Sequence, residues 1–121
     1  MRMGKKVGTD DQAYWEIEGG TSGCVWYGPY IDLALGKYRV EYQLTIAPSS
    51  TSNKVYASVD VCANNGRNIL TQQDITADNV HLEMHSLTFV SFQTLKGVEF
   101  RINSTGNGRL KIKKVKIVRE F

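Results

Sequence analysis

Apolar and polar residues alternate along much of the chain, and the pattern is clearest over residues 37–46. Every second side chain from Tyr38 to Ile46 is apolar there, and the side chains between them are polar. A period of two predicts a β-strand that buries one face. Residues 55–63 repeat the pattern, and residues 98–103 form a third segment of the same kind.

The last segment, residues 109–119, alternates in two halves that are out of step. Leu110 and Ile112 have one parity, whereas Val115 and Ile117 have the other. A regular strand cannot bury both pairs, because neighbouring side chains point to opposite faces. We therefore predict a β-bulge near Lys113–Lys114.

Weaker strand patterns occupy residues 13–18, 25–31 and 68–75, and residues 84–92 carry apolar side chains on both faces, which predicts a more deeply covered strand. Clusters of Gly, Asn, Ser and Pro separate these segments, and residues 76–82 have room for one short turn. About eight short strands at this spacing predict an all-β fold. We expect a two-sheet antiparallel β-sandwich of the jelly-roll type.

The length of 121 residues suits a single hydrophobic core. We expect residues 1–11, which are polar and glycine-bearing, to form a flexible N-terminal tail, and residues 12–121 to form one β-sandwich domain. No apolar run is long enough to cross a membrane, and the basic N-terminus lacks the apolar segment of a secretory signal. These two features predict no membrane partner, and they do not determine the cellular compartment of the protein.

The charge balance is mildly basic, with a net charge of +3. A dedicated nucleic-acid binder carries a stronger excess, so we predict no nucleic-acid partner. The basic residues of segment 109–119 fit a solvated edge that lysines protect against aggregation. The sequence also lacks a nucleophile elbow, a phosphate-binding Gly-Lys-Ser/Thr loop and a dinucleotide fingerprint, and we predict no catalytic activity.

Candidate metal ligands and cysteines are few. Cys24 and Cys62 are predicted to be reduced and largely buried, with one disulfide as the alternative in a secreted chain. His81 and His85 would lie about 13 Å apart on a strand, which predicts two surface histidines that share no ion. An acidic group near the N-terminus either forms a calcium site or is acid-rich surface: Asp10, Asp11, Glu16 and Glu18. We predict no other cofactor.

Aromatic residues cluster in the first thirty positions, at Tyr14, Trp15, Trp26, Tyr27 and Tyr30. Adjacent residues of a strand point to opposite faces, so at least one member of each adjacent pair is expected to leave the core. Trp and Tyr offer large, stiff surfaces on which the CH faces of a sugar ring can lie. We predict Trp26, Tyr27 and Trp15 as ligand platforms, with ordinary core packing as the alternative.

Two polar regions supply further candidates. Residues 103–108 are rich in short polar side chains, and Asn103, Thr105 and Asn107 are predicted to hydrogen-bond to hydroxyl groups unless the segment is a plain hairpin turn. The outward faces of three strands would form a polar floor if those strands were neighbours, and a solvated face with ion pairs is the alternative. Its members are Arg39, Glu41, Gln43, Tyr56, Asp60, Glu99 and Arg101.

Residues 26–33 and 36–40, followed by 59–70, 97–102 and 110–115, resemble the strands and turns of galactose-binding-like β-sandwich modules. The chain is similar in this respect to carbohydrate-binding families six and thirty-five. The resemblance implies a sugar site at the loop end, where Trp26 and Asn107 match an aromatic residue and an asparagine. It also implies a structural calcium, which Glu16 or Glu18 would hold, but Lys111 and Lys113 stand where the last strand should supply an acid.

These observations predict a non-catalytic carbohydrate-binding module that recognises a saccharide by aromatic stacking and loop hydrogen bonds. The alternative is a structural domain that self-associates into a homodimer or larger homo-oligomer. A broad apolar patch around Trp15, Tyr27 and Tyr30 would favour the alternative, whereas aromatics beside a groove would favour the module. The identity of the sugar stays open.

Overall fold

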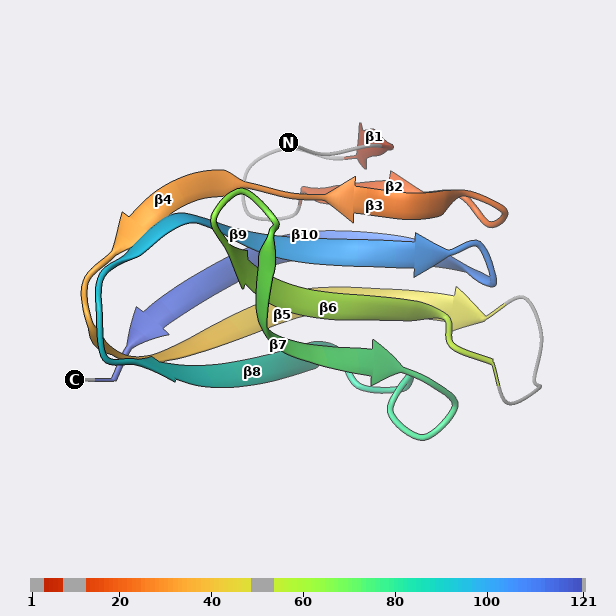
Figure 1. Cartoon of the computed structure of the whole chain (residues 1–121). Coiled ribbons are helices and arrows are strands. Elements are labelled where there is room, and N and C mark those ends of the chain that lie inside the picture. Colours follow the sequence, from red (N-terminus) through yellow and green to blue (C-terminus); the bar gives the residue numbers. More distant parts are fainter. Residues whose placement is uncertain (1–3, 8–12, 49–53, 121) are drawn as a thin grey trace.

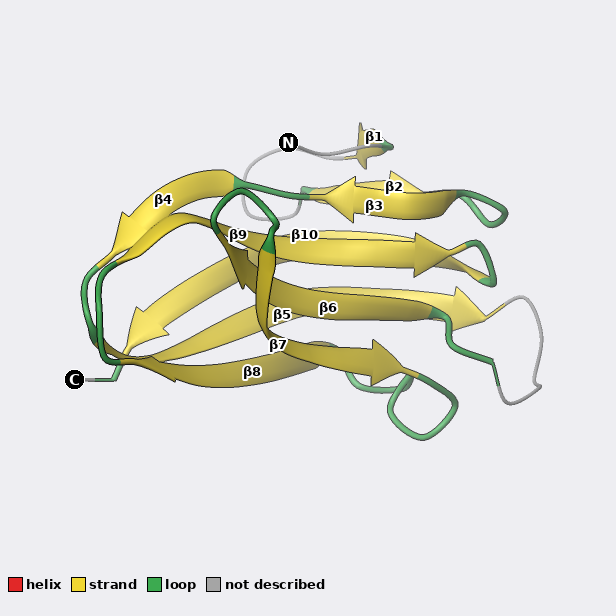
Figure 2. Ribbon diagram, viewed as in Figure 1, coloured by secondary structure: helices red, strands yellow, loops and turns green. Residues whose placement is uncertain are grey.

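The computed structural model describes residues 4–7, 13–48 and 54–120, and these residues form two antiparallel β-sheets packed face to face (Figures 1 and 2). Their ten strands are β1 (Lys5–Val7), β2 (Tyr14–Ile17), β3 (Ser22–Trp26), β4 (Pro29–Leu33), β5 (Gly36–Pro48), β6 (Ala57–Ala63), β7 (Asn68–Ile75), β8 (Met84–Ser91), β9 (Leu95–Thr105) and β10 (Gly108–Arg119). The described residues contain no helix that could cross a membrane.

The strand order is that of a jelly roll. Sheet B runs β1-β2-β10-β5-β8, and sheet A runs β3-β9-β6-β7, with β4 also paired to β9. When β1 and β4 are set aside, the chain passes from one sheet to the other at every connection except the β6–β7 hairpin, which is the double Greek-key arrangement of eight strands. The predicted all-β sandwich is confirmed.

The core lies between the sheets and follows the alternation seen in the sequence. In β5, Tyr38, Val40, Tyr42 and Leu44 are buried, the polar side chains between them are half-buried, and Lys37 and Thr45 on either side are exposed. The inward faces of β6 and β9 complete this core with Val59, Val61, Val98, Phe100 and Ile102, each at most 5% exposed. Burying a side chain of this size stabilises the fold by about 1.5–3 kcal/mol relative to leaving it in water.

The predicted β-bulge in β10 is confirmed. The pairing of β10 with β5 shifts between Ile112 and Lys114, so Lys113 is the extra residue. Before the shift Leu110 and Ile112 are fully buried, and after it Val115 and Ile117 pack against the same core. The inserted residue therefore lets both halves of the strand bury their apolar side chains.

Three expectations about strands were wrong. Residues 84–92 were expected to be covered on both faces, but β8 is the edge of sheet B and alternates between exposed and buried side chains. Residues 25–31 do not form one strand, because the chain breaks between β3 and β4. Within the expected N-terminal tail, Lys5–Val7 forms β1 and pairs with β2, while residues 1–3 and 8–12 lie outside the described part.

One buried polar contact links the two sheets through the core. The hydroxyl of Tyr42, on β5 of sheet B, donates to the backbone carbonyl of Asp60 on β6 of sheet A over 2.5 Å. Tyr42 is fully buried, and burial raises the pKa of its hydroxyl above the usual value. The hydroxyl is therefore a fixed donor that ties the layers together.

We expect Tyr42→Phe to lower the free energy of unfolding by about 1–2 kcal/mol, because it removes a buried hydrogen bond between the two sheets. Urea denaturation measures the change. Tyr38→Phe is the matched control: its hydroxyl donates to the carbonyl of Ala34, an exposed residue whose oxygen water can reach. Equal losses in the two variants would contradict a special role for the Tyr42 contact.

Candidate functional site

A pocket of about 630 Å³ opens between the two sheets beside the β3–β4 connection. We call it the aromatic pocket. Strand β2 contributes Trp15, and the segment that leaves β3 contributes Trp26 and Tyr27. The remaining lining comes from Gly28, Pro29, Ile31, Phe100, Val115 and Ile117. The pocket thus brings together the three aromatic residues that were predicted from the sequence as ligand platforms.

Local backbone geometry opens this side of the sandwich. Gly28, with φ of +89°, separates β3 from β4, and its carbonyl accepts a hydrogen bond of 2.9 Å from the amide of Phe100. A positive φ of this size strains residues that carry a side chain, which explains a glycine here. On the facing sheet, β2 pairs with β10 only as far as Ile112, so Val115 and Ile117 lie beyond the covered part of the strand.

The chemistry of the pocket is apolar. Among the described residues that line it, none is charged, and the polar atoms are backbone groups, two indole N–H groups and the Tyr27 hydroxyl. Tyr27 also meets Tyr30 edge-on, with ring centroids 6.5 Å apart. Flat rings with a few hydrogen-bonding edges suit a ligand that has both apolar faces and hydroxyl groups.

The predicted loop residues do not join this pocket. Thr105 Oγ1 donates to the carbonyls of Val55 and Tyr56, and the Asn107 side-chain amide donates to Val55 over 3.1 Å. These contacts anchor residues 55–56 to the β9–β10 turn, and neither side chain lines the aromatic pocket. The pairing of Trp26 with Asn107 that the resemblance implied is therefore not formed as one site.

The predicted polar floor is divided between opposite faces of the sandwich. Arg39, Glu41 and Gln43 belong to β5 in sheet B, whereas Asp60, Glu99 and Arg101 belong to sheet A. Arg39 pairs instead with Glu41 at 3.1 Å and with Glu120 at 3.2 Å. Tyr56, which precedes β6, is only 1% exposed and offers almost no surface to a ligand.

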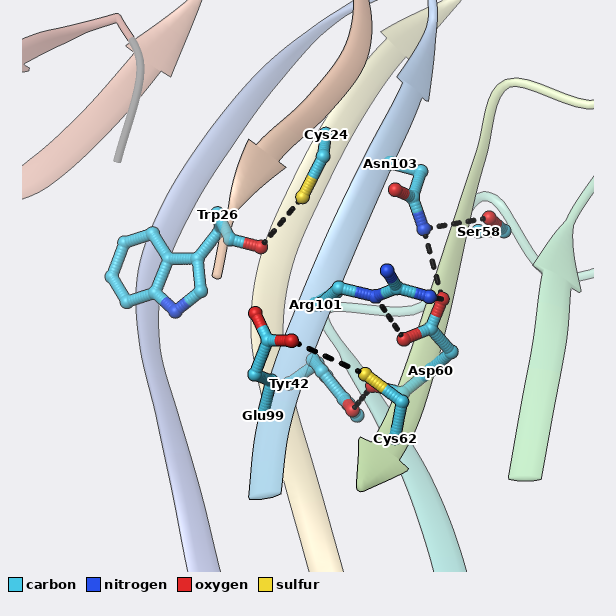
Figure 3. A network of polar contacts seen from close by, with 9 residues as sticks. All are labelled: Cys24, Trp26, Tyr42, Ser58, Asp60, Cys62, Glu99, Arg101 and Asn103. Atoms are coloured by element: carbon cyan, nitrogen blue, oxygen red, sulfur yellow. Dashed lines mark hydrogen bonds and ion pairs between the residues drawn. The ribbon is translucent and has the colours of Figure 1, made fainter. Parts of the chain in front are cut away.

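The outer face of sheet A carries a connected polar network (Figure 3). Arg101 on β9 donates from Nε and Nη2 to the carboxylate of Asp60 on β6, at 2.8 and 3.2 Å. Asn103 donates to the same carboxylate over 3.1 Å. This bonding raises the pKa of Arg101 above its usual value. The Trp26 ring points away from the network (Figure 3), and Trp26 lines the aromatic pocket.

The network is unusually buried for an outer sheet face, with Asp60 2% and Glu99 4% exposed. The connection from β6 to β7 explains the cover, because it rises across the front of β9 (Figure 1). Asn64 and Asn65 donate backbone hydrogen bonds to Lys96 and Gly97 there. The Asp60–Arg101 pair is therefore a shielded ion pair whose charges are mutually satisfied, and it offers little surface to a ligand.

Both cysteines are free thiols beneath or beside this network. Cys62 Sγ lies 3.7 Å from a carboxylate oxygen of Glu99, and burial raises the pKa of this thiol to about 12. Burial also raises the pKa of Cys24. Neutral thiols are poor nucleophiles, so the geometry gives neither residue the features of a catalytic cysteine.

Metal-binding features are sparse. Among the described residues, no group of three or more His, Cys, Asp or Glu side chains is placed to hold an ion. Glu16 pairs with Arg109 at 3.5 Å, and Asp10 and Asp11 lie outside the described residues. The prediction of two surface histidines was wrong for His85, which is 3% exposed and has its pKa lowered by burial.

Several pocket residues were missed from the sequence, namely Pro29, Phe100, Val115 and Ile117. Two signals pointed to them. The parity change in β10 placed Val115 and Ile117 on the inner face, and the Gly28-Pro29 dipeptide marked a break opposite them. Reading the two together would have required knowing that β10 and β3–β4 lie in facing sheets.

Comparison with known proteins identifies the fold. A family 16 carbohydrate-binding module superposes with a TM-score of 0.63 at 12% identity, covering 88% of this chain and 77% of that one. The chain has the fold of a carbohydrate-binding module. The structure of TmCBM61 in complex with β-1,4-galactotriose superposes with a TM-score of 0.56 at 14% identity, and the match covers 92% of this chain and 73% of that one. No protein-family model matches the sequence, and no curated protein sequence matches it.

A further match with the same fold is not named as a carbohydrate-binding module. A structure of accessory secretory proteins 1, 2 and 3 from Streptococcus pneumoniae matches with a TM-score of 0.55 at 11% identity, covering 96% of this chain and 89% of that one. At this level of identity the likeness concerns the fold alone. Function has to be argued from the sites.

We expect Arg101→Met to destabilise the domain by about 3 kcal/mol, because it leaves the buried Asp60 carboxylate without its cationic partner. The double variant Asp60→Asn with Arg101→Met should recover much of that loss, since it removes both charges together. Chemical denaturation of both variants tests this. Arg39→Met, which breaks a more exposed pair, is the control and should cost less than about 1 kcal/mol.

Proposed function

We propose that the protein is a non-catalytic carbohydrate-binding module whose aromatic pocket receives a saccharide. The observation that carries the proposal is the convergence of Trp15, Trp26 and Tyr27 on one pocket of about 630 Å³. A pocket of this volume is within the range of small-ligand sites. The three rings offer stacking surface for the CH groups of a sugar.

The fold supports this proposal without fixing the ligand. Modules of the same fold include one whose structure contains β-1,4-galactotriose, which makes short galactans a sensible first probe. Nothing in the aromatic pocket provides a general acid, a general base or an activated nucleophile, because its lining has no charged residue and neither cysteine belongs to it. Binding without catalysis is therefore the function that the pocket fits best.

We expect a glycan-array screen to identify a neutral oligosaccharide ligand, and Tyr27→Ala and Trp26→Ala each to weaken its binding at least about tenfold, or about 1.4 kcal/mol. Calorimetric titration measures the affinities, and thermal melting shows whether each variant remains folded. Trp26→Phe keeps a ring and should bind with intermediate affinity.

Phe92→Ala is the matched control, because Phe92 is 90% exposed and outside the aromatic pocket. It should leave binding unchanged. The proposal fails if no glycan binds, or if the folded Tyr27→Ala variant binds as tightly as the original chain.

A second candidate function is self-association through β8. This edge strand has no Lys, Arg, Asp, Glu or Pro, so it lacks the usual protection against pairing with another chain. Its outer face and its end expose Met84 at 49%, Val90 at 50% and Phe92 at 90%. Antiparallel pairing of two copies about Leu87 would place Met84 opposite Val90, which is a self-complementary arrangement.

We expect the chain, if it self-associates in this way, to show a concentration-dependent dimer in sedimentation velocity that Val90→Lys abolishes. A lysine at this position places two charges within the paired edge. Gln73→Lys on β7, the exposed edge strand of the other sheet, is the control and should leave the dimer intact. A monomer at every concentration would rule out this function.

A further inference from the structure

A second pocket, of about 250 Å³, lies on the outer face of sheet B. We call it the basic pocket. Its polar lining spans neighbouring strands: Tyr14 comes from β2, Lys111 and Lys113 come from β10, and Gln43 and Thr45 come from β5. Glu83, which precedes β8, closes the far side. The pocket is therefore built on the rigid middle of the sheet.

The strand register places both lysines at this pocket. Lys111 is opposite Thr45 on one side and Glu16 on the other, and Lys114 is opposite Gln43. Lys113 is the extra residue between Ile112 and Lys114, and its exposed side chain lines the pocket. Lys111 and Lys113 are two residues apart, and this spacing turns side chains of a strand to the same face.

Neither lysine is neutralised. Among the described residues, neither Lys111 nor Lys113 forms an ion pair with a carboxylate. Glu16, the acid opposite Lys111, pairs with Arg109 at 3.5 Å. The Lys111 ammonium instead lies 5.3 Å from the centre of the Tyr14 ring. A cation–π contact of this kind holds the ammonium in place and leaves its charge available.

The surroundings add positive charge. Lys114 and Lys116 follow on β10, and both are exposed. Glu41, the acid opposite Lys116, is engaged by Arg39 at 3.1 Å. Of the residues that line the basic pocket, Glu83 alone is acidic, so the lining carries a net positive charge.

We propose that the basic pocket is a second saccharide site, which takes a sugar that carries an acidic group, either a uronate carboxylate or a sulfate. Lys111 and Lys113 would bind the acidic group, while Gln43, Thr45 and Glu83 supply donors and acceptors for neutral hydroxyls. The proposal rests on the proposed function in taking a saccharide as the ligand. It concerns a separate site, because the aromatic pocket has no charged lining and faces the inside of β10.

The test is calorimetric titration of the whole chain with three probes at low salt: an oligogalacturonate, a sulfated galacto-oligosaccharide and neutral β-1,4-galactotriose. We expect at least one acidic probe to bind, and the variant Lys111→Gln with Lys113→Gln to weaken that binding at least about tenfold. Raising the salt should weaken it further, because exposed charges are screened. The two acidic probes distinguish a uronate from a sulfate.

Lys114→Gln with Lys116→Gln is the matched control, because it removes the same charge from the same strand without altering the lining. It should reduce acidic-probe binding by less than about threefold. Equal losses in the two double variants would show diffuse attraction and overturn the site. Failure of both acidic probes to bind would overturn it as well.

Two further measurements separate this proposal from the previous one. Tyr27→Ala should leave acidic-probe binding unchanged, and the Lys111→Gln with Lys113→Gln variant should leave neutral-probe binding unchanged. If an acidic probe binds the original chain and no neutral glycan does, the aromatic pocket fails as a saccharide site and the basic pocket stands. If a neutral glycan binds and neither acidic probe does, the basic pocket fails and the aromatic pocket stands. A short DNA duplex that binds with the same dependence on Lys111 and Lys113 would overturn the assignment to sugars.

Discussion

Strand β10 must bury apolar side chains along its whole length, and its sequence permits this only with one extra residue at Lys113. Neighbouring residues of a strand face opposite ways, so the bulge resets the alternation for everything that follows. On the inner face it supplies Val115 and Ile117 to the aromatic pocket. On the outer face the extra residue is itself one of the two lysines that line the basic pocket. Lys113 therefore belongs to one candidate site, and the bulge that it forms completes the other.

Much of the fold was predictable because its determinants are local. Alternation in β5 survives in the burial pattern, since this strand covers the core with one face only. In β6 and β9 the expected apolar residues also lie in the core, although Asp60 and Glu99 on the other face are buried too. The bulge was predictable for the same reason. The role of β8 was not, because apolar residues on both faces can indicate either a covered strand or an exposed edge. Only the pairing order, a property of the whole chain, distinguishes the two.

The site was predictable in part. Trp15, Trp26 and Tyr27 were predicted as ligand platforms because they are close in sequence, and the two facing sheets bring them together in one pocket. The role of the loop residues was harder to predict, because a short polar side chain that can bind a ligand hydroxyl can equally bind a nearby backbone carbonyl. Thr105 and Asn107 bind carbonyls. The outward face of sheet A likewise looked open in sequence, but the β6–β7 connection covers it through contacts that no strand pattern encodes.

The bulged residue also bears on how such a domain can diverge. Deleting Lys113 would let Lys114 follow Ile112 directly, and β10 would become a regular strand in which Lys114 and Lys116 still point outward and Val115 and Ile117 still point inward. The aromatic pocket would keep its β10 residues, whereas the basic pocket would lose one of its two lysines. A change in length at this position can therefore alter the outer surface of the sheet and leave the core side chains in place.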